Sequence, residues 1–109
     1  MSFNRALGLR REGDDVVLDT KPEHEVMPGV IHFAVLTTMA EVAAAAAVDT
    51  PVVPASLTVN LLERASPGRL VARGRVLRKG KRLAVAEGEV YSGTTLVAKA
   101  VVTFAVMSP

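Results

Sequence analysis

The sequence predicts an α+β protein in which one long helix packs against an antiparallel sheet, and three observations predict this class. The length of 109 residues suits one ordinary domain, so we expect a single domain over residues 1–109. Half of the residues are hydrophobic, which is too many for a disordered chain. One stretch repeats apolar residues at helical spacing, and four later stretches alternate apolar and polar residues.

The helix is predicted over Val30–Val48, after a short strand at Asp15–Asp19 and a loop that contains Pro28-Gly29. One face of this stretch follows a period near 3.6 residues: Leu36, Ala40, Ala43, Ala44 and Ala47. Pro51 and Pro54 follow, and the helix should end before them because proline cannot continue the hydrogen-bond ladder. Since alanine side chains are short, we expect this helix to lie very close to whatever covers it.

Four strands are predicted after Pro54, joined as three hairpins in series. They are Ser56–Leu62, Arg69–Leu77, Leu83–Tyr91 and Leu96–Val106. One face of the last three is small and apolar: Leu70, Ala72, Gly74 and Val76, then Ala84, Ala86, Gly88 and Val90, then Leu96, Ala98, Ala100, Val102 and Phe104. The other face carries charges of alternating sign that are expected to pair across the sheet: Arg73 and Arg75, Glu87 and Glu89, and Lys99. The alanine-rich helix should therefore lie in the palm of a curved sheet.

The composition excludes several classes of function. Without cysteine there is no thiolate nucleophile and no disulfide, and two histidines alone do not complete a typical metal site. Aromatic residues make up only 4% of the chain, so a surface that stacks nucleic-acid bases is not expected. No stretch has the pattern of a signal peptide or the length of a membrane span. We therefore expect a cytoplasmic protein with neither a membrane nor a nucleic acid as partner.

The net charge of +2 conceals an asymmetry between the two halves of the chain. Residues 1–60 carry four basic and eight acidic side chains, whereas residues 61–109 carry nine basic and three acidic ones. The basic half contains one dense group, Arg78-Lys79-Gly80-Lys81-Arg82. This group is too short for a nucleic-acid stripe but could hold a few phosphates. The alternative is a hairpin tip that charge merely keeps solvated.

Two stretches carry a resemblance to a known family. The first contains Gly29, His32 and Glu41, which occupy the first glycine, the histidine and the acid of a family pattern: a Gly-x-x-His-Gly-Gly turn at a helix start, with an acid nine positions after the histidine. The second is Ser56–Leu62, with Pro67-Gly68 behind it. In their order and spacing these stretches resemble the hotdog-fold acyl-CoA thioesterases of the phenylacetate-type, PaaI-like branch. The resemblance covers nearly the whole chain and implies a hotdog fold, in which a curved antiparallel sheet wraps a long central helix.

The resemblance also implies an activity, the hydrolysis of an aryl- or acyl-CoA thioester to a free acid and CoA. Coenzyme A would be part of the substrate, and no metal or other cofactor would be needed. Glu41 would be the nucleophile or general base, and the backbone N–H of Phe33 would polarise the thioester carbonyl. Ser56 would orient the attacking water, and His32 belongs to the motif at the helix start.

The resemblance further implies partners for the active site. In the family the acid and the polarising N–H come from different subunits, so we expect a homodimer or a tetramer of two dimers. The basic residues would meet the phosphates of CoA: Arg78, Lys79, Lys81 and Arg82, with Gly80 allowing the tight turn. Arg64 and Arg69 are the second choice for these phosphates.

Three positions depart from the family pattern. Phe33 and Ala34 replace the two motif glycines, and Val26 replaces an Asn or Gln that helps to hold the carboxylate or water. These departures keep open a second interpretation, a non-catalytic hotdog protein that binds acyl-CoA or a protein partner. Glu41 could also be an ordinary solvent-facing residue, and His32 could serve only to cap the helix. A hotdog hydratase is disfavoured, because the Asp and His pairing expected on its helix is missing.

Overall fold

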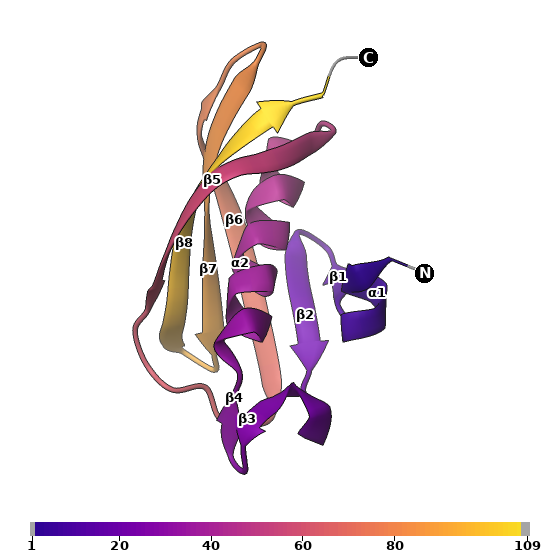
Figure 1. Cartoon of the computed structure of the whole chain (residues 1–109), viewed down its shortest axis with the longest axis vertical. Coiled ribbons are helices and arrows are strands. Elements are labelled where there is room, and N and C mark those ends of the chain that lie inside the picture. Colours follow the sequence, from indigo (N-terminus) through magenta and orange to yellow (C-terminus); the bar gives the residue numbers. More distant parts are fainter. Residues whose placement is uncertain (1, 108–109) are drawn as a thin grey trace.

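The computed structural model describes residues 2–107, in which one long helix lies across a curved six-stranded antiparallel sheet (Figure 1). The elements in chain order are α1 (Phe3–Leu7), β1 (Arg10–Glu12), β2 (Asp15–Asp19), a 3₁₀ turn η1 (Pro22–His24), β3 (Glu25–Met27), β4 (Val30–Ile31), α2 (Phe33–Val48), β5 (Val52–Leu61), β6 (Arg69–Lys79), β7 (Leu83–Ser92) and β8 (Thr95–Val106). The sheet order is β1-β2-β6-β7-β8-β5, and β3 and β4 form a separate pair. None of the helices described is long and apolar enough to cross a membrane.

Helix α2 approaches the sheet so closely that two sheet positions have no room for a side chain. A Cβ atom on Gly88 would overlap the carbonyl oxygen of Ala40, and one on Gly74 would overlap that of Ala43. The two alanines are themselves almost completely buried against this surface. The close approach that the small residues predict is therefore confirmed, and glycine is required at both positions because the helix backbone occupies the space.

The predicted helix is correct at its end but begins three residues too early. Val30 and Ile31 form the short strand β4, which pairs with β3. His32 is extended, with φ −63° and ψ 137°, and α2 starts at Phe33. An apolar pair such as Val30-Ile31 fits a helix or a strand equally well, and only its pairing with β3 decides between them.

The strand predictions are confirmed for β2, β6, β7 and β8 to within two residues at each end. Strand β5 begins at Val52 rather than at Ser56, because an edge strand tolerates Pro54 beside an irregularity in its pairing. The predicted hairpin between β5 and β6 is wrong. Strand β5 pairs with β8 at the end of the sheet, and β6 pairs with β2 and β7. The other two hairpins, β6–β7 and β7–β8, are confirmed.

Ion pairs join the strands on the charged face of the sheet as predicted for Arg75, Glu87, Glu89 and Lys99, whereas Arg73 pairs instead with Asp15 of β2 at 3.0 Å. The Arg75 guanidinium lies 2.6 Å from the Glu87 carboxylate, and the Lys99 ammonium lies 3.4 Å from both Glu87 and Glu89. Burial acts to raise the pKa of Glu87, but the hydrogen bonds and charges of Arg75 and Lys99 outweigh it and lower that pKa. This network covers the face of the sheet that points away from α2. The residues expected to be catalytic on α2, Phe33 and Glu41, therefore lie on the other face of the sheet.

Candidate active site

The first turn of α2 leaves one backbone donor free. The Nδ1 atom of His32 accepts the N–H of Ala34 at 2.9 Å, and the His32 carbonyl accepts the N–H of Val35 at 3.0 Å. The N–H of Phe33 has no acceptor among residues 2–107. Because unpaired amides and the helix dipole both favour negative charge at this end, the Phe33 N–H is suited to polarise a carbonyl oxygen.

His32 therefore acts as a cap in this structure. Since its Nδ1 atom accepts a backbone N–H, the neutral ring carries its proton on Nε2. The ring also stacks on Phe33, with 4.6 Å between the two ring centroids. A direct role of His32 in catalysis stays a prediction, and Nε2 is the atom left for it.

An apolar pocket of about 340 Å³ adjoins the start of α2. Its walls are Val30, Ile31, Phe33, Leu36, Leu61, Leu62, Glu63, Arg64 and Ala65. The last five belong to the end of β5 and the segment that follows it. That segment is fixed in place, because the N–H of Leu62 donates to the Val97 carbonyl and the N–H of Ile31 donates to the Ala65 carbonyl, both at 2.9 Å. The pocket thus places apolar surface beside a free amide donor.

Glu41 lies on the same helix, half-buried among alanines. Burial raises the pKa of its carboxyl group, which makes the carboxylate a better base than an exposed glutamate. Glu41 follows Phe33 by eight residues, or about 12 Å along the helix axis at roughly 1.5 Å per residue. This separation is too large for both groups of one chain to act on one thioester carbonyl.

Ser56 is exposed and lies on the opposite side of the sheet from α2. An irregularity in β5 between Pro54 and Ser56 places Ser56 opposite Thr103, whose side chain faces away from the helix. Without that extra residue Ser56 would pair with the buried Val102 and face inward. The structure does not bring Ser56 and Glu41 of one chain together, so the role expected of Ser56 stays a prediction.

The basic group lies at the β6–β7 tip, at the far end of α2 from Phe33 (Figure 1). An irregularity between Val76 and Arg78 turns Lys79 toward the helix, and its Nζ atom donates to the Val48 carbonyl at 2.8 Å. Lys79 thus binds the negative end of the α2 dipole. Three exposed cations remain at the tip for an anion: Arg78, Lys81 and Arg82. Gly80 closes the turn by donating its N–H to the Leu83 carbonyl at 2.8 Å.

Arg64 and Arg69, the second choice for binding the CoA phosphates, lie in different surroundings. Arg69 is paired with Glu12 at 2.6 Å, whereas Arg64 lies at the apolar pocket beside Phe33. Spacing in the sequence could not place Arg64 beside Phe33, because the segment that contains Arg64 reaches the helix only through contacts of the folded chain. Within one chain, Arg64 is therefore the predicted phosphate ligand that lies near the free amide.

Two further residues near the start of α2 have either a structural role or no polar group to offer. The Thr38 hydroxyl donates back to the Ala34 carbonyl at 2.8 Å, so it is used within the helix. Val26 is 54% exposed on β3 and supplies no polar group to the turn. Among residues 2–107, no three His, Asp or Glu side chains gather so that they could hold a metal ion.

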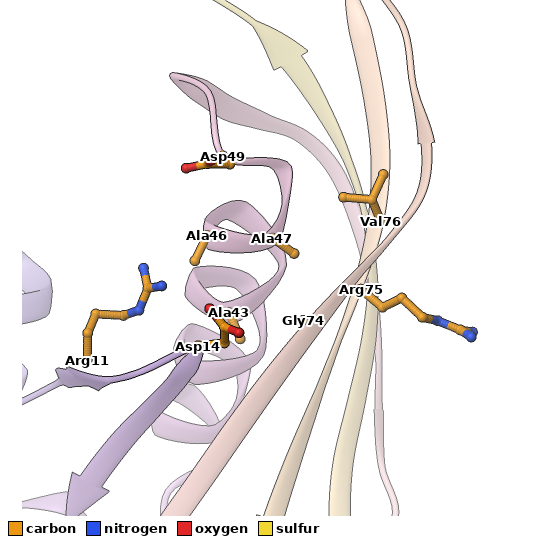
Figure 2. A pocket seen from close by; sticks show the side chains of 9 residues that line it. All are labelled: Arg11, Asp14, Ala43, Ala46, Ala47, Asp49, Gly74, Arg75 and Val76. Atoms are coloured by element: carbon orange, nitrogen blue, oxygen red, sulfur yellow. The ribbon is translucent and has the colours of Figure 1, made fainter.

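A second cavity, of about 440 Å³, lies at the other end of α2 (Figure 2). Its floor consists of helix alanines and Gly74, and its rim carries Arg11, Asp14 and Asp49. Arg75 lines the cavity only with the backbone end of the residue, since its side chain extends away on the far side of the sheet to bind Glu87. No local pattern predicted this cavity, because its rim joins segments far apart in the chain. It carries none of the predicted catalytic residues.

The protein has a hotdog fold: a long helix lies in the palm of a curved antiparallel sheet, and the helix begins at a histidine-capped turn. A sequence model of the thioesterase superfamily matches residues 28–99, and the chain belongs to that superfamily. The matched range includes Phe33, Glu41 and Ser56. No curated protein matches this chain.

Solved structures agree with this assignment. The conserved protein PA5202 from Pseudomonas aeruginosa is 26% identical, with 98% of this chain and 94% of that one covered and a TM-score of 0.89. A mutant of the phenylacetic acid degradation protein PaaI from Thermus thermophilus is also 26% identical, with 96% and 98% covered and a TM-score of 0.85. The BH2602 protein from Bacillus halodurans, solved with CoA, is 23% identical, with 84% and 70% covered and a TM-score of 0.78. This last likeness concerns the fold.

Proposed function

We propose that this protein is an acyl-CoA thioesterase that hydrolyses an aryl- or acyl-CoA thioester at a site shared by two copies of the chain. The observation that carries the proposal is the free N–H of Phe33, which lies at the start of α2 beside an apolar pocket. The carbonyl oxygen of the thioester would accept this N–H, and the acyl group would occupy the pocket. Negative charge that develops on the oxygen is then stabilised by the amide and the helix dipole.

Glu41 supplies the base in this proposal. Its carboxylate takes a proton from a water molecule while the water oxygen bonds to the acyl carbon. The carbon–sulfur bond then breaks, and the sulfur of CoA leaves with the proton that Glu41 received. The products are the free acid and CoA, and Glu41 returns to its starting state. A direct attack by Glu41 on the acyl carbon is the alternative within the same site.

The second copy is needed because Glu41 lies too far along α2 from the Phe33 N–H of its own chain. Strand β5 offers the surface through which a second copy could bind. It ends the sheet and pairs only with β8. Four apolar residues on it and just after it are about half exposed: Val53, Leu57 and Leu61 on β5, and Leu62 directly after it. A long apolar edge of this kind pairs readily with another strand. We propose a homodimer through β5, and a tetramer of two such dimers stays a prediction.

The recognition of CoA is the finer part of the proposal. A protein of the same fold, BH2602, was solved with CoA, which supports the view that the fold can accommodate this molecule. The tip cations of one copy, Arg78, Lys81 and Arg82, would hold the phosphates of CoA while the thioester lies at Phe33 of the other copy. Arg64 would hold them if CoA binds to a single chain. A cytoplasmic location also stays a prediction.

Thiol release from a panel of aryl- and acyl-CoA thioesters, followed with a thiol-trapping dye, tests the activity. Turnover that depends on Glu41 supports the proposal. Tight binding of the same thioesters without turnover supports the non-catalytic alternative. One structural observation favours that alternative, because Val26 gives the turn no side chain that could hold a water molecule.

A further inference from the structure

The turn that starts α2 is attached to a buried histidine that has no part in the proposed reaction. His24 is only 5% exposed. Its Nδ1 atom accepts the backbone N–H of Lys21 at 2.9 Å, so the neutral ring carries its proton on Nε2. The Nε2 atom lies 2.9 Å from the carbonyl oxygen of Leu7 and donates to it. Both ring nitrogens are thus used, one within the 3₁₀ turn η1 and the other to the end of α1.

The backbone of His24 continues this chain of contacts to the proposed oxyanion donor. Its carbonyl accepts the N–H of His32 at 2.9 Å, and His32 is the residue that caps α2 immediately before Phe33. The orientation of the Phe33 amide therefore depends on the peptide of His32, which the His24 carbonyl holds.

The hairpin between His24 and His32 is too small to hold the turn by itself. Its strands, β3 and β4, have three and two residues, and Val26 and Met27 are more than half exposed. A two-stranded hairpin of this size is at best marginally stable in water. The turn is therefore fixed at its ends, by the Ile31 N–H on the Ala65 carbonyl and by the His32 N–H on the His24 carbonyl.

We infer that His24 is a positioning residue for the N–H of Phe33. Its ring fixes the His24 peptide against η1 and the end of α1, and that peptide fixes the start of α2. The inference rests on the proposed function only where it concerns catalysis. The mechanical link from His24 to His32 can be tested whether or not the protein hydrolyses thioesters.

Three substitutions separate the contacts of the ring. His24→Ala removes both. His24→Asn places an amide oxygen near the position of Nδ1 and can keep the contact with Lys21, whereas His24→Gln places an amide nitrogen near Nε2 and can keep the contact with Leu7. Thr20→Val is the matched control, because it removes a 2.7 Å bond between the Thr20 hydroxyl and the Gly68 N–H without touching the start of α2.

Amide hydrogen exchange tests the link directly. We expect the His32 amide to exchange at least about tenfold faster in His24→Ala, while amides in the middle of α2 keep their rates, because the opening is local. His24→Asn and His24→Gln should give intermediate rates, and they replace the alanine variant if it does not fold. An unchanged His32 rate in all folded variants, or the same increase in Thr20→Val, would overturn the inference.

Steady-state kinetics test the consequence for catalysis. A misplaced oxyanion donor weakens the transition state more than substrate binding, so kcat should fall by about tenfold to a hundredfold with KM within about twofold. His24→Asn or His24→Gln should recover part of kcat. Faster exchange at His32 with an unchanged kcat would show that His24 is structural only. If the unsubstituted protein turns over no thioester, the proposed function fails, and the exchange result still decides the link.

Discussion

The two edges of the sheet differ in length and in charge. Strand β1 has three residues, Arg10, Arg11 and Glu12, and it is laced by ion pairs such as Arg10–Glu12 and Arg69–Glu12. Strand β5 has ten residues, none of them charged, and several exposed apolar side chains. Proteins protect sheet edges from unwanted pairing with short, charged strands. The β1 edge has this protection and the β5 edge lacks it. This difference is the reason for the proposal that two chains meet at β5 and share an active site there.

The largest effect on activity is expected at Glu41, the proposed base, which the β5 interface would bring to the Phe33 amide of the other chain. Glu41→Gln keeps the shape of the side chain and removes its charge, so kcat should fall by about two to four orders of magnitude. Thiol release measures the loss, and circular dichroism verifies that the variant is folded. A fall of less than about threefold would move the base to another residue.

A smaller but still large effect should distinguish the two edges. Leu57→Lys places a charge on β5, so it should shift the protein from dimer to monomer and lower activity at least about tenfold. Arg10→Ala on β1 is the matched control and should change neither. Light scattering after size-exclusion chromatography gives the masses. A dimer that survives Leu57→Lys, or one lost in Arg10→Ala, would reverse the assignment of the edges.

A modest effect is expected at the phosphates of CoA. Joint replacement Lys81→Ala and Arg82→Ala should raise KM for acyl-CoA by about three- to tenfold at low salt with kcat almost unchanged, since exposed ion pairs are individually weak and are screened by salt. Lys79 is left intact because it binds the end of α2.

Two comparisons complete this test of the tip. N-acetylcysteamine thioesters, which lack the phosphates, should not distinguish the joint variant from the unsubstituted protein. Arg64→Ala is the parallel variant on a single chain. If Arg64→Ala raises KM and the joint variant does not, the phosphates bind beside Phe33 rather than at the tip.

The smallest effect concerns stability. Burial raises the pKa of Glu41 in the folded protein, so the folded state holds this proton more tightly than the unfolded state does. Stability from this group is therefore present in acid and lost as pH rises from the ordinary glutamate pKa through the raised one. Glu41→Gln should melt at a higher temperature than the unsubstituted protein at neutral pH, and the gap should close as pH falls through this window. An equal gap at all pH values would exclude ionisation as its cause.

Local signals in the sequence were sufficient for much of the fold. The limits of β2 and the end of α2 follow from Gly, Asp and Pro residues beside them, and the close contact of helix and sheet follows from Gly74, Gly88 and the alanines. The place of β5 at the edge could not be predicted, because it depends on pairing with β8, far along the chain.

The candidate site was predictable only in part. The family resemblance, carried by Gly29, His32 and the acid nine positions after His32, pointed to Phe33 and Glu41. The free N–H of Phe33 agrees with the role expected of it, and the roles themselves stay predictions. The sides of the sheet on which Ser56 and Lys79 lie were not predictable. Each side is set by one extra residue in a strand, and no local signal marks such an irregularity. The contacts of His24 likewise join segments that only the folded chain brings together.

A complementation experiment tests the shared site most directly. Phe33→Pro removes the proposed donor and should fold, because proline is favoured at the first position of a helix and His32 already has the extended backbone that precedes proline. Glu41→Gln removes the proposed base. In a mixed dimer of the two variants, the intact Phe33 amide of one chain would face the intact Glu41 of the other.

The measurement is the thiol-release rate of the two inactive variants after they are unfolded and refolded together, with native mass spectrometry to verify that mixed dimers form. A site shared by two chains predicts recovery of about a quarter of the unsubstituted activity, because half of the dimers are mixed and each holds one intact site of two. An activity no greater than that of the separate variants, with mixed dimers present, would contradict a site built from two chains.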